Sequence, residues 1–275
     1  MGEKIRLSIE NLFNRDVLLP FRQRSRGVRT GVSHSDLSRR MFNALASYGM
    51  KELLIAGGGA YLKTAAVTAG YLIVEEYGIS SINQTIDITI SGKNGLDSGT
   101  EVANKWYSIW IIYDEKTQEV AGLFSTSESA PTLPVGFTKK RRVGWIRNNN
   151  AADFVRFDQR NNKIFYHNMQ TTSASTATTW TDVNCSTFVP KTTGQALAVM
   201  NLNKGTATTA EIMIRPNGSE GDGWSVGALG ADSFPTKILR RQITLPMDSS
   251  QIFEYWLDQI GNTTLIEIFG YEDQF

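Results

Sequence analysis

The sequence predicts an all-β protein, a jelly-roll-like antiparallel β-sandwich preceded by a short N-terminal arm and helix. The strongest observation is the run Trp106–Tyr113, in which every residue is aromatic, β-branched or hydroxyl-bearing. Such a run is typical of a strand that packs on both faces. About a dozen short apolar runs at regular spacing, separated by Asn, Gly and Pro, favour the same class. A high content of Thr, Ser, Asn and Gly also favours strands over helices.

The chain of 275 residues is long enough to bury a sizeable core. We expect residues 1–60 to form a basic arm plus a short helix that attaches the protein to a partner, and residues 61–275 to form the sandwich domain. Charge is unevenly spread, because residues 1–40 hold nine basic and four acidic side chains while the whole chain has a net charge of +1.

The N-terminal region has two expected parts. Residues 1–34 read as an extended arm that contains Pro20. Ser35 or Asp36 can cap a short helix with apolar residues at helical spacing, and Gly49 can end it. This is the one helix that the sequence predicts.

Strands are expected from residue 61 onward. The expected strands are 61–67, 71–76, 82–90, 106–113, 120–124, 142–147, 154–157, 164–166, 196–202, 210–214, 224–228, 241–245, 252–257 and 264–269. Asn161-Asn162 predicts a two-residue hairpin, because Asn tolerates a positive φ. Gly261-Asn262 predicts a second hairpin between the last two strands, and the Ser/Thr-rich residues 168–189 a long surface connection.

The sequence does not match the known motifs for catalysis, metal binding or cofactor binding that we considered. The two histidines, His34 and His167, have no Cys or carboxylate at ligand spacing, so we expect no zinc site and no catalytic triad. The glycines at 57–59 lead to Leu62, where a phosphate loop or a dinucleotide fingerprint needs a small residue, and they read as a joint. Residues 217–223 lack the carboxylate series of a calcium loop and read as a solvated turn. We expect no catalytic residue, metal or cofactor.

The sequence also contains no pattern typical of a disulfide-dependent, exported or membrane-inserted protein. The single Cys185 excludes an intramolecular disulfide, so the fold does not depend on an oxidising compartment. The first ten residues do not resemble a signal peptide, and no apolar run approaches the roughly 20 residues of a membrane helix, so no membrane insertion is expected.

Six arginines make the arm a candidate docking segment. They are Arg22, Arg24, Arg26, Arg29, Arg39 and Arg40. Binding of nucleic-acid phosphates and docking to an acidic protein partner both fit this composition. The modest local charge and the interleaved apolar residues Phe21, Val28 and Leu37 favour docking.

Two tryptophans are candidates for contact with a ligand. Trp180 and Trp224 are next to expected loops, where an indole ring can stack on a sugar, although packing explains them as well. Trp106, Trp110 and Trp145 fall within expected strands and are interpreted as packing residues.

Several segments together resemble a β-rich module of bacteriophage virion proteins, especially tail-fibre and related host-contact subunits. They are Gly95–Glu101 with Trp106–Tyr107, Trp110–Tyr113, Ala121–Ser125, Leu133–Thr138, Arg142–Arg147 and the closing Leu265–Glu272. The resemblance covers about residues 80–167 and the C-terminal strand. It implies a non-enzymatic structural subunit of the virion, a homotrimer with one end anchored and the sandwich displayed outward. The matching positions are scaffold and turn residues, so it implies no binding residue.

Three functions follow as alternatives. The first is a tail fibre or receptor-binding subunit, attached to other virion proteins through the arm and facing a host surface glycan or protein. The second is a head fibre, a capsid decoration protein or a jelly-roll capsid subunit. The third is a polysaccharide depolymerase, for which Asp153, Asp158 and Asp182 are the acids to consider, and the absence of a recognisable catalytic pattern speaks against it.

Overall fold

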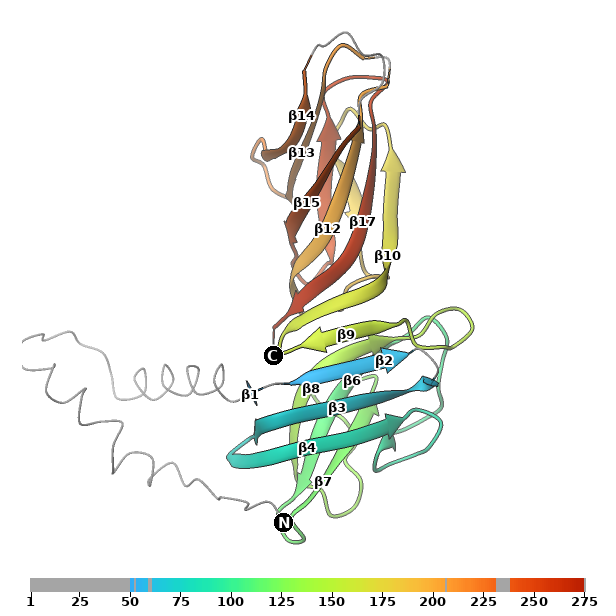
Figure 1. Cartoon of the computed structure of the whole chain (residues 1–275), viewed down its shortest axis with the longest axis vertical. Coiled ribbons are helices and arrows are strands. Elements are labelled where there is room, and N and C mark those ends of the chain that lie inside the picture. Colours follow the sequence, from blue (N-terminus) through green and yellow to red (C-terminus); the bar gives the residue numbers. More distant parts are fainter. Residues whose placement is uncertain (1–49, 52, 59–60, 206, 231–237, 275) are drawn as a thin grey trace, which may run out of the picture. The chain divides into compact units, whose positions relative to one another are not determined.

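A computed structural model describes residues 50–51, 53–58, 61–205, 207–230 and 238–274 (Figure 1). These residues form strands and turns without a helix, and the sheets are largely antiparallel, with a short parallel pair of β5 with β7. The predicted all-β class is therefore confirmed. The predicted arm and the predicted helix after Ser35 lie outside the described residues.

The chain divides into two compact units. Unit 1 contains the described residues up to Ala56 together with Lys63–Glu101 and Tyr107–Val143. Unit 2 contains the described residues of Gly57–Leu62, Val102–Trp106 and Gly144–Phe275. The sequence alone had led us to expect one sandwich domain over residues 61–275.

Unit 1 is built from two sheets whose strands are the blue to green arrows of Figure 1. Its strands are β1 (Met50–Lys51), β2 (Leu54–Gly58), β3 (Tyr61–Val74), β4 (Tyr77–Asp87), β5 (Gly95–Leu96), β6 (Trp106–Asp114), β7 (Glu119–Ser125) and β8 (Lys139–Arg147), the ends of β2, β3, β6 and β8 belonging to unit 2. In one sheet β3 pairs with β1 and β4, and in the other the order is β5-β7-β6-β8. Strand β4 contacts β7 and β5, so the two sheets pack against each other.

The two sheets pack closely where β4 lies against Gly122 of β7. A Cβ added to Gly122 on β7 would overlap the side chain of Ile86 on β4. Ile86 is fully buried, as are Ile109, Ile111 and Leu123 of the facing sheet. Glycine at position 122 therefore allows the isoleucine to lie directly on the β7 backbone.

Strands β3 and β4 share a kink. Buried residues alternate along β4 at 82, 86 and 88, but the next buried residue toward its start is Ile79, three positions before Ile82. Between them Ser81 has a left-handed backbone with φ of 56°. Regular alternation would turn either Ile79 or Ile82 to solvent, so this kink keeps both side chains inside.

Unit 2 is also built from two sheets. Its strands are β9 (Phe157–Arg160), β10 (Lys163–Ser175), β11 (Thr181–Asn184), β12 (Thr193–Asn203), β13 (Ala210–Pro216), β14 (Trp224–Leu229), β15 (Ile238–Pro246), β16 (Ile252–Leu257) and β17 (Thr263–Asp273). One sheet contains β9-β10-β17-β12-β15 in that order, and the other contains β11-β16-β13-β14. The alternation of buried and partly exposed residues in β12, β13 and β17 gives each sheet one core-facing side.

Most predicted strands are confirmed, among them the strand at Trp106–Tyr113, which becomes β6. The tryptophans Trp110 and Trp145 are buried as predicted. The hairpin at Asn161-Asn162 is also confirmed, because Arg160 pairs with Lys163 and Asn161 has a φ of 54°.

Three predictions about the second half of the chain are wrong. The strand expected at 154–157 begins only at Phe157, as β9. The expected surface connection over residues 168–189 contains the end of β10 and all of β11, because Thr side chains are good strand formers as well as loop residues. The expected terminal hairpin does not form, because β16 pairs with β11 and β13 whereas β17 pairs with β10 and β12. The segment around Gly261 therefore carries the chain from one sheet to the other.

Candidate functional site

The outward side of the sheet β11-β16-β13-β14 carries a cluster of aromatic and charged side chains, here called the Trp180 cluster. It consists of Trp180, Asp182, Arg215, Glu254 and Trp256. Arg215 on β13 is directly opposite Glu254 on β16, and Glu254 is opposite Asp182 on β11. Residues at matching positions of neighbouring antiparallel strands project to the same side, which explains why the cluster forms.

Arg215 is the centre of the Trp180 cluster. Its Nε and Nη2 atoms donate to the two carboxylate oxygens of Glu254 at 2.7 and 3.1 Å, and its Nη1 donates to the carbonyl oxygen of Gly221 at 3.0 Å. The side chains of Arg215 and Glu254 are only 15% and 12% exposed. A two-point ion pair with so little solvent contact fixes both side chains in one geometry.

The indole rings complete the cluster. The guanidinium carbon of Arg215 lies 4.2 Å from the ring centre of Trp180, a cation–π arrangement. The ring of Trp256 is 6.4 Å from that of Trp180, and its Nε1 donates to the carbonyl oxygen of Thr178 at 2.8 Å. Arg215 thus covers one face of the Trp180 ring, and the cluster presents a mixed aromatic and charged surface rather than a bare indole plate.

The two tryptophans predicted as ligand contacts, Trp180 and Trp224, meet through Gly223, the residue before Trp224. Trp224 begins β14 opposite Ile214 and is 42% exposed. The preceding Gly223 has φ of 74°, and a Cβ there would come within 2.6 Å of the Trp180 ring. The loop that carries Trp224 therefore lies against Trp180 at this point, and glycine is needed for that approach.

The other predicted site residues are not described. Arg22, Arg24, Arg26, Arg29, Arg39 and Arg40 lie outside the described residues. Sequence reasoning, for its part, did not find Arg215, Glu254 or Trp256. They are distant in sequence, and only the pairing of β13 with β16 brings them together.

His167 has an acidic partner that sequence spacing did not predict. Its Nε2 lies 3.0 Å from the Oδ2 atom of Asp158, because the hairpin of β9 and β10 places the two residues near each other. Both side chains are partly exposed, at 34% and 60%. Within the described residues no group of three or more His, Cys, Asp or Glu side chains could hold a metal ion.

Cys185 is buried and chemically protected. Its side chain is inaccessible to solvent, and burial raises the pKa of the thiol to about 12. Burial likewise raises the pKa of the phenol of Tyr166 on β10, whose hydroxyl donates to the carbonyl oxygen of Phe188 at 2.5 Å. At neutral pH both groups are neutral, so neither is suited to nucleophilic chemistry.

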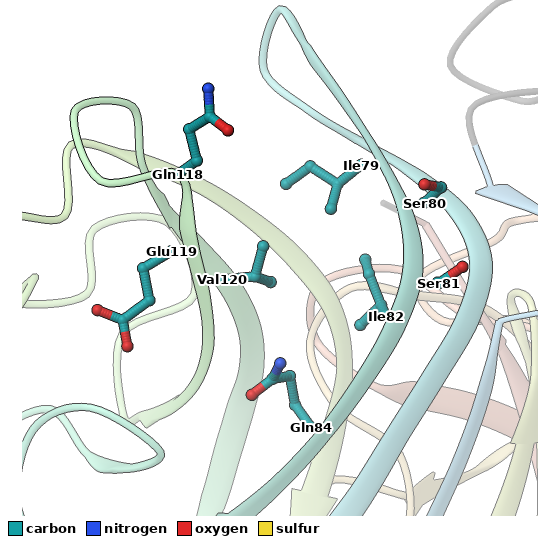
Figure 2. A pocket seen from close by; sticks show the side chains of 8 residues that line it. All are labelled: Ile79, Ser80, Ser81, Ile82, Gln84, Gln118, Glu119 and Val120. Atoms are coloured by element: carbon teal, nitrogen blue, oxygen red, sulfur yellow. The ribbon is translucent and has the colours of Figure 1, made fainter. Parts of the chain in front are cut away.

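Unit 1 contains a separate groove of about 340 Å³ between β4 and β7. Figure 2 shows Ile79, Ile82 and Val120 pointing into it, with Gln84 and Gln118 at its two ends. Glu119 is the charged residue among those that line the groove. Its carboxylate points away from the groove and pairs with Lys93 at 2.6 Å. The centre of this groove is aliphatic and its ends are uncharged, which suits an apolar side chain better than a charged ligand.

No protein-family model matches the sequence, and no curated protein matches it. Among the described residues there is no helix with the length and apolar character that crossing a membrane requires.

Proposed function

We propose that unit 2 is a jelly roll. Four antiparallel strand pairs are nested in the sequence: β10 with β17, β11 with β16, β12 with β15 and β13 with β14. Two further pairings, β17 with β12 and β16 with β13, join them into two sheets. This is the order expected when one long antiparallel ladder is wound into a two-sheet sandwich.

This nested pairing is the observation that carries the proposed function. Jelly rolls of this kind are common in viral capsid and lectin domains, which are assembly and recognition modules. Together with the resemblance to phage host-contact modules, it favours a non-enzymatic phage virion structural protein. The chain is then a tail fibre or receptor-binding subunit located in the virion, anchored by its N-terminal arm and displaying the β-sandwich.

The turn that contains Gly95–Glu101, one of the segments that carry the resemblance to phage proteins, has a structural role in unit 1. The carboxylate of Asp97 accepts hydrogen bonds from the Ser125 hydroxyl at 2.7 Å and the Thr132 amide at 2.9 Å. The side-chain oxygen of Asn94 accepts from the Gly122 amide at 2.7 Å. These residues tie the turns to β7, as expected of a scaffold module.

A matched pair of arm variants tests the anchoring role. Changing all six arm arginines to serine should abolish incorporation into particles, whereas changing them to lysine keeps the charge and should preserve much of it. The soluble proteins should keep the far-UV circular dichroism of the parent. Normal incorporation of the serine variant would show that the arm is not the anchor.

Location in the particle separates the first function from its alternatives. Antibodies against unit 2 should decorate the tail tip in electron micrographs of intact phage. Decoration of the head would favour a head fibre, a decoration protein or a capsid subunit, and particles without label would contradict a virion role. Hydrolysis of host polysaccharide by the purified protein would instead favour the depolymerase.

The subunit is proposed to be a homotrimer. Light scattering should then give three times the chain mass of 30.5 kDa. A stable monomer at micromolar concentration would contradict the trimer without affecting the virion assignment.

The Trp180 cluster and Trp224 are the proposed contact surface for a host glycan or protein. Trp224→Ala should weaken binding of purified protein to host cells, because 42% of this residue is exposed and open to a ligand, while the protein stays folded in circular dichroism. Ile238→Ala, which removes a side chain 67% exposed at the start of β15, is the matched control. Equal binding of both variants would exclude Trp224 from the contact surface.

A further inference from the structure

Strand β4 has an open edge in unit 1. Its one strand partner among the described residues is β3. Between Tyr77 and Asp87 it contains no charged residue and no proline. Natural edge strands are commonly protected by such residues against pairing with further strands, so this edge is open to an additional strand.

Two hydrogen bonds show which backbone groups face the open edge. The amide of Ile88 donates to Lys63 on β3 at 3.0 Å, and the amide of Asp87 donates to Asn94, away from β3, at 2.9 Å. Because amide directions alternate along a strand, the amides of Thr85 and Asn83 also point away from β3. Among the described residues, no neighbouring strand accepts a hydrogen bond from either of these two amides.

The groove lies beside this edge. On the far side of the groove, the Gly122 amide donates to the side-chain oxygen of Asn94 at 2.7 Å, and the Gly122 carbonyl accepts from the Asn94 amide at 2.9 Å. Val120, two residues earlier on β7, presents its backbone in the same direction and its side chain to the groove. A strand added to β4 would therefore bring every second side chain onto Ile79, Ile82 and Val120.

The sequence contains a segment of matching pattern. In residues 4–10 the apolar residues Ile5, Leu7 and Ile9 alternate strictly with Lys4, Arg6, Ser8 and Glu10. Such alternation is the signature of a strand with one buried face. We propose that residues 4–10 add to the open edge of β4 in the same chain and insert their aliphatic side chains into the groove.

Chain connectivity favours the same chain as the source. Met50 on β1 pairs with Leu72 on β3, and Leu72 pairs with Ile79 on β4. With neighbouring strands about 4.8 Å apart, Met50 is about 10 Å from Ile79. The intervening residues 11–49 can span this distance many times over, and a tethered segment has an effective concentration of the order of millimolar.

This inference does not depend on the proposed virion role. It leaves the six arginines in the segment between the docked strand and β1, where they remain available for a partner.

A cysteine scan in the full-length protein tests the docking. Val120→Cys is combined with single cysteines at each position from 4 to 10, and disulfide formation is measured on non-reducing gels. Cys185 is buried and does not interfere. Because a disulfide needs Cα atoms within about 7 Å, we expect strong cross-linking at one of the positions 5, 7 and 9, weak cross-linking at 4, 6, 8 and 10, and a product with the mass of one chain. Uniform or absent cross-linking would overturn the proposal, and a product of two chains would overturn its assignment to the same chain.

Hydrogen exchange gives a second readout without engineered cysteines. Leu7→Asp should accelerate exchange of the Asn83 and Thr85 amides at least about tenfold, because a carboxylate cannot enter the aliphatic groove. Ser8→Asp, which adds the same charge on the polar face, should leave their exchange unchanged. Amides of unit 2 serve as the internal control. Equal exchange in the parent and the Leu7→Asp variant would contradict docking.

Discussion

Arg215 and Glu254 face each other across β13 and β16, and the guanidinium holds both oxygens of the carboxylate at 2.7 and 3.1 Å. The pair is nearly enclosed, and the Trp180 ring covers the guanidinium at 4.2 Å. The arrangement ties strands β13 and β16 to the residue that directly precedes β11.

Breaking this pair on one side should be costly. We expect Arg215→Ala to destabilise unit 2 by about 2–4 kcal/mol, because Glu254 is left with little solvent and without its ion partner. Urea unfolding followed by tryptophan fluorescence measures the change. The double variant Arg215→Met with Glu254→Leu is the control and should be more stable than Arg215→Ala. A loss below about 0.5 kcal/mol would place the pair among ordinary surface ion pairs.

Gly122 should resist enlargement. A Cβ at this position overlaps Ile86, so Gly122→Ala is expected to cost about 1–3 kcal/mol in unfolding free energy. Adding Ile86→Val should recover part of the loss by shortening the facing side chain. Gly230→Ala, where no described residue has an atom within 4 Å of the added Cβ, is the control and should be nearly neutral. Equal effects at both glycines would contradict close packing of β4 on β7.

Ser81 should tolerate glycine but not a β-branched residue. Its φ of 56° is strained for side chains branched at Cβ, so Ser81→Val should cost about 1–2 kcal/mol whereas Ser81→Gly should stay within about 0.5 kcal/mol. Thermal unfolding of the two variants measures this. Ser80→Val, next to it on the same strand, is the control and should be tolerated better than Ser81→Val. The opposite order would mean that the kink is not at Ser81.

Cys185 should make the protein sensitive to alkali. The pKa of its thiol is raised by burial from 9.0 to about 12, so the folded state keeps a proton that the unfolded state releases first. The free energy of unfolding is not affected by this thiol below about pH 9, and it falls as the pH rises from there toward 12. Denaturation midpoints between pH 8 and 11 should therefore fall less steeply in Cys185→Ala than in the parent. Identical slopes would assign the decline to other groups, such as Tyr166.

The same burial predicts slow alkylation of Cys185. Because burial raises the pKa of this thiol to about 12, the folded protein holds very little of the reactive thiolate at pH 8. Iodoacetamide should thus modify Cys185 rapidly in urea and very slowly in buffer, as measured by intact-mass spectrometry. Fast labelling of folded protein would contradict its burial.

The amino-acid sequence by itself determined the all-β class and the position of most strands. These features depend on local composition, such as the unbroken run Trp106–Tyr113, and on turn residues such as Asn161 that accept a positive φ. Local composition acts on neighbouring residues, so it can be read without knowing the fold.

Strand partners were decided only by the tertiary structure. The sequence pattern around Gly261 is that of a hairpin, yet β16 and β17 belong to different sheets because each buries its apolar face against partners distant in the chain. The Trp180 cluster has the same origin, since Arg215 and Glu254 meet only through the pairing of β13 with β16. Contacts of this kind depend on the register between distant strands, a property that no short stretch of sequence contains.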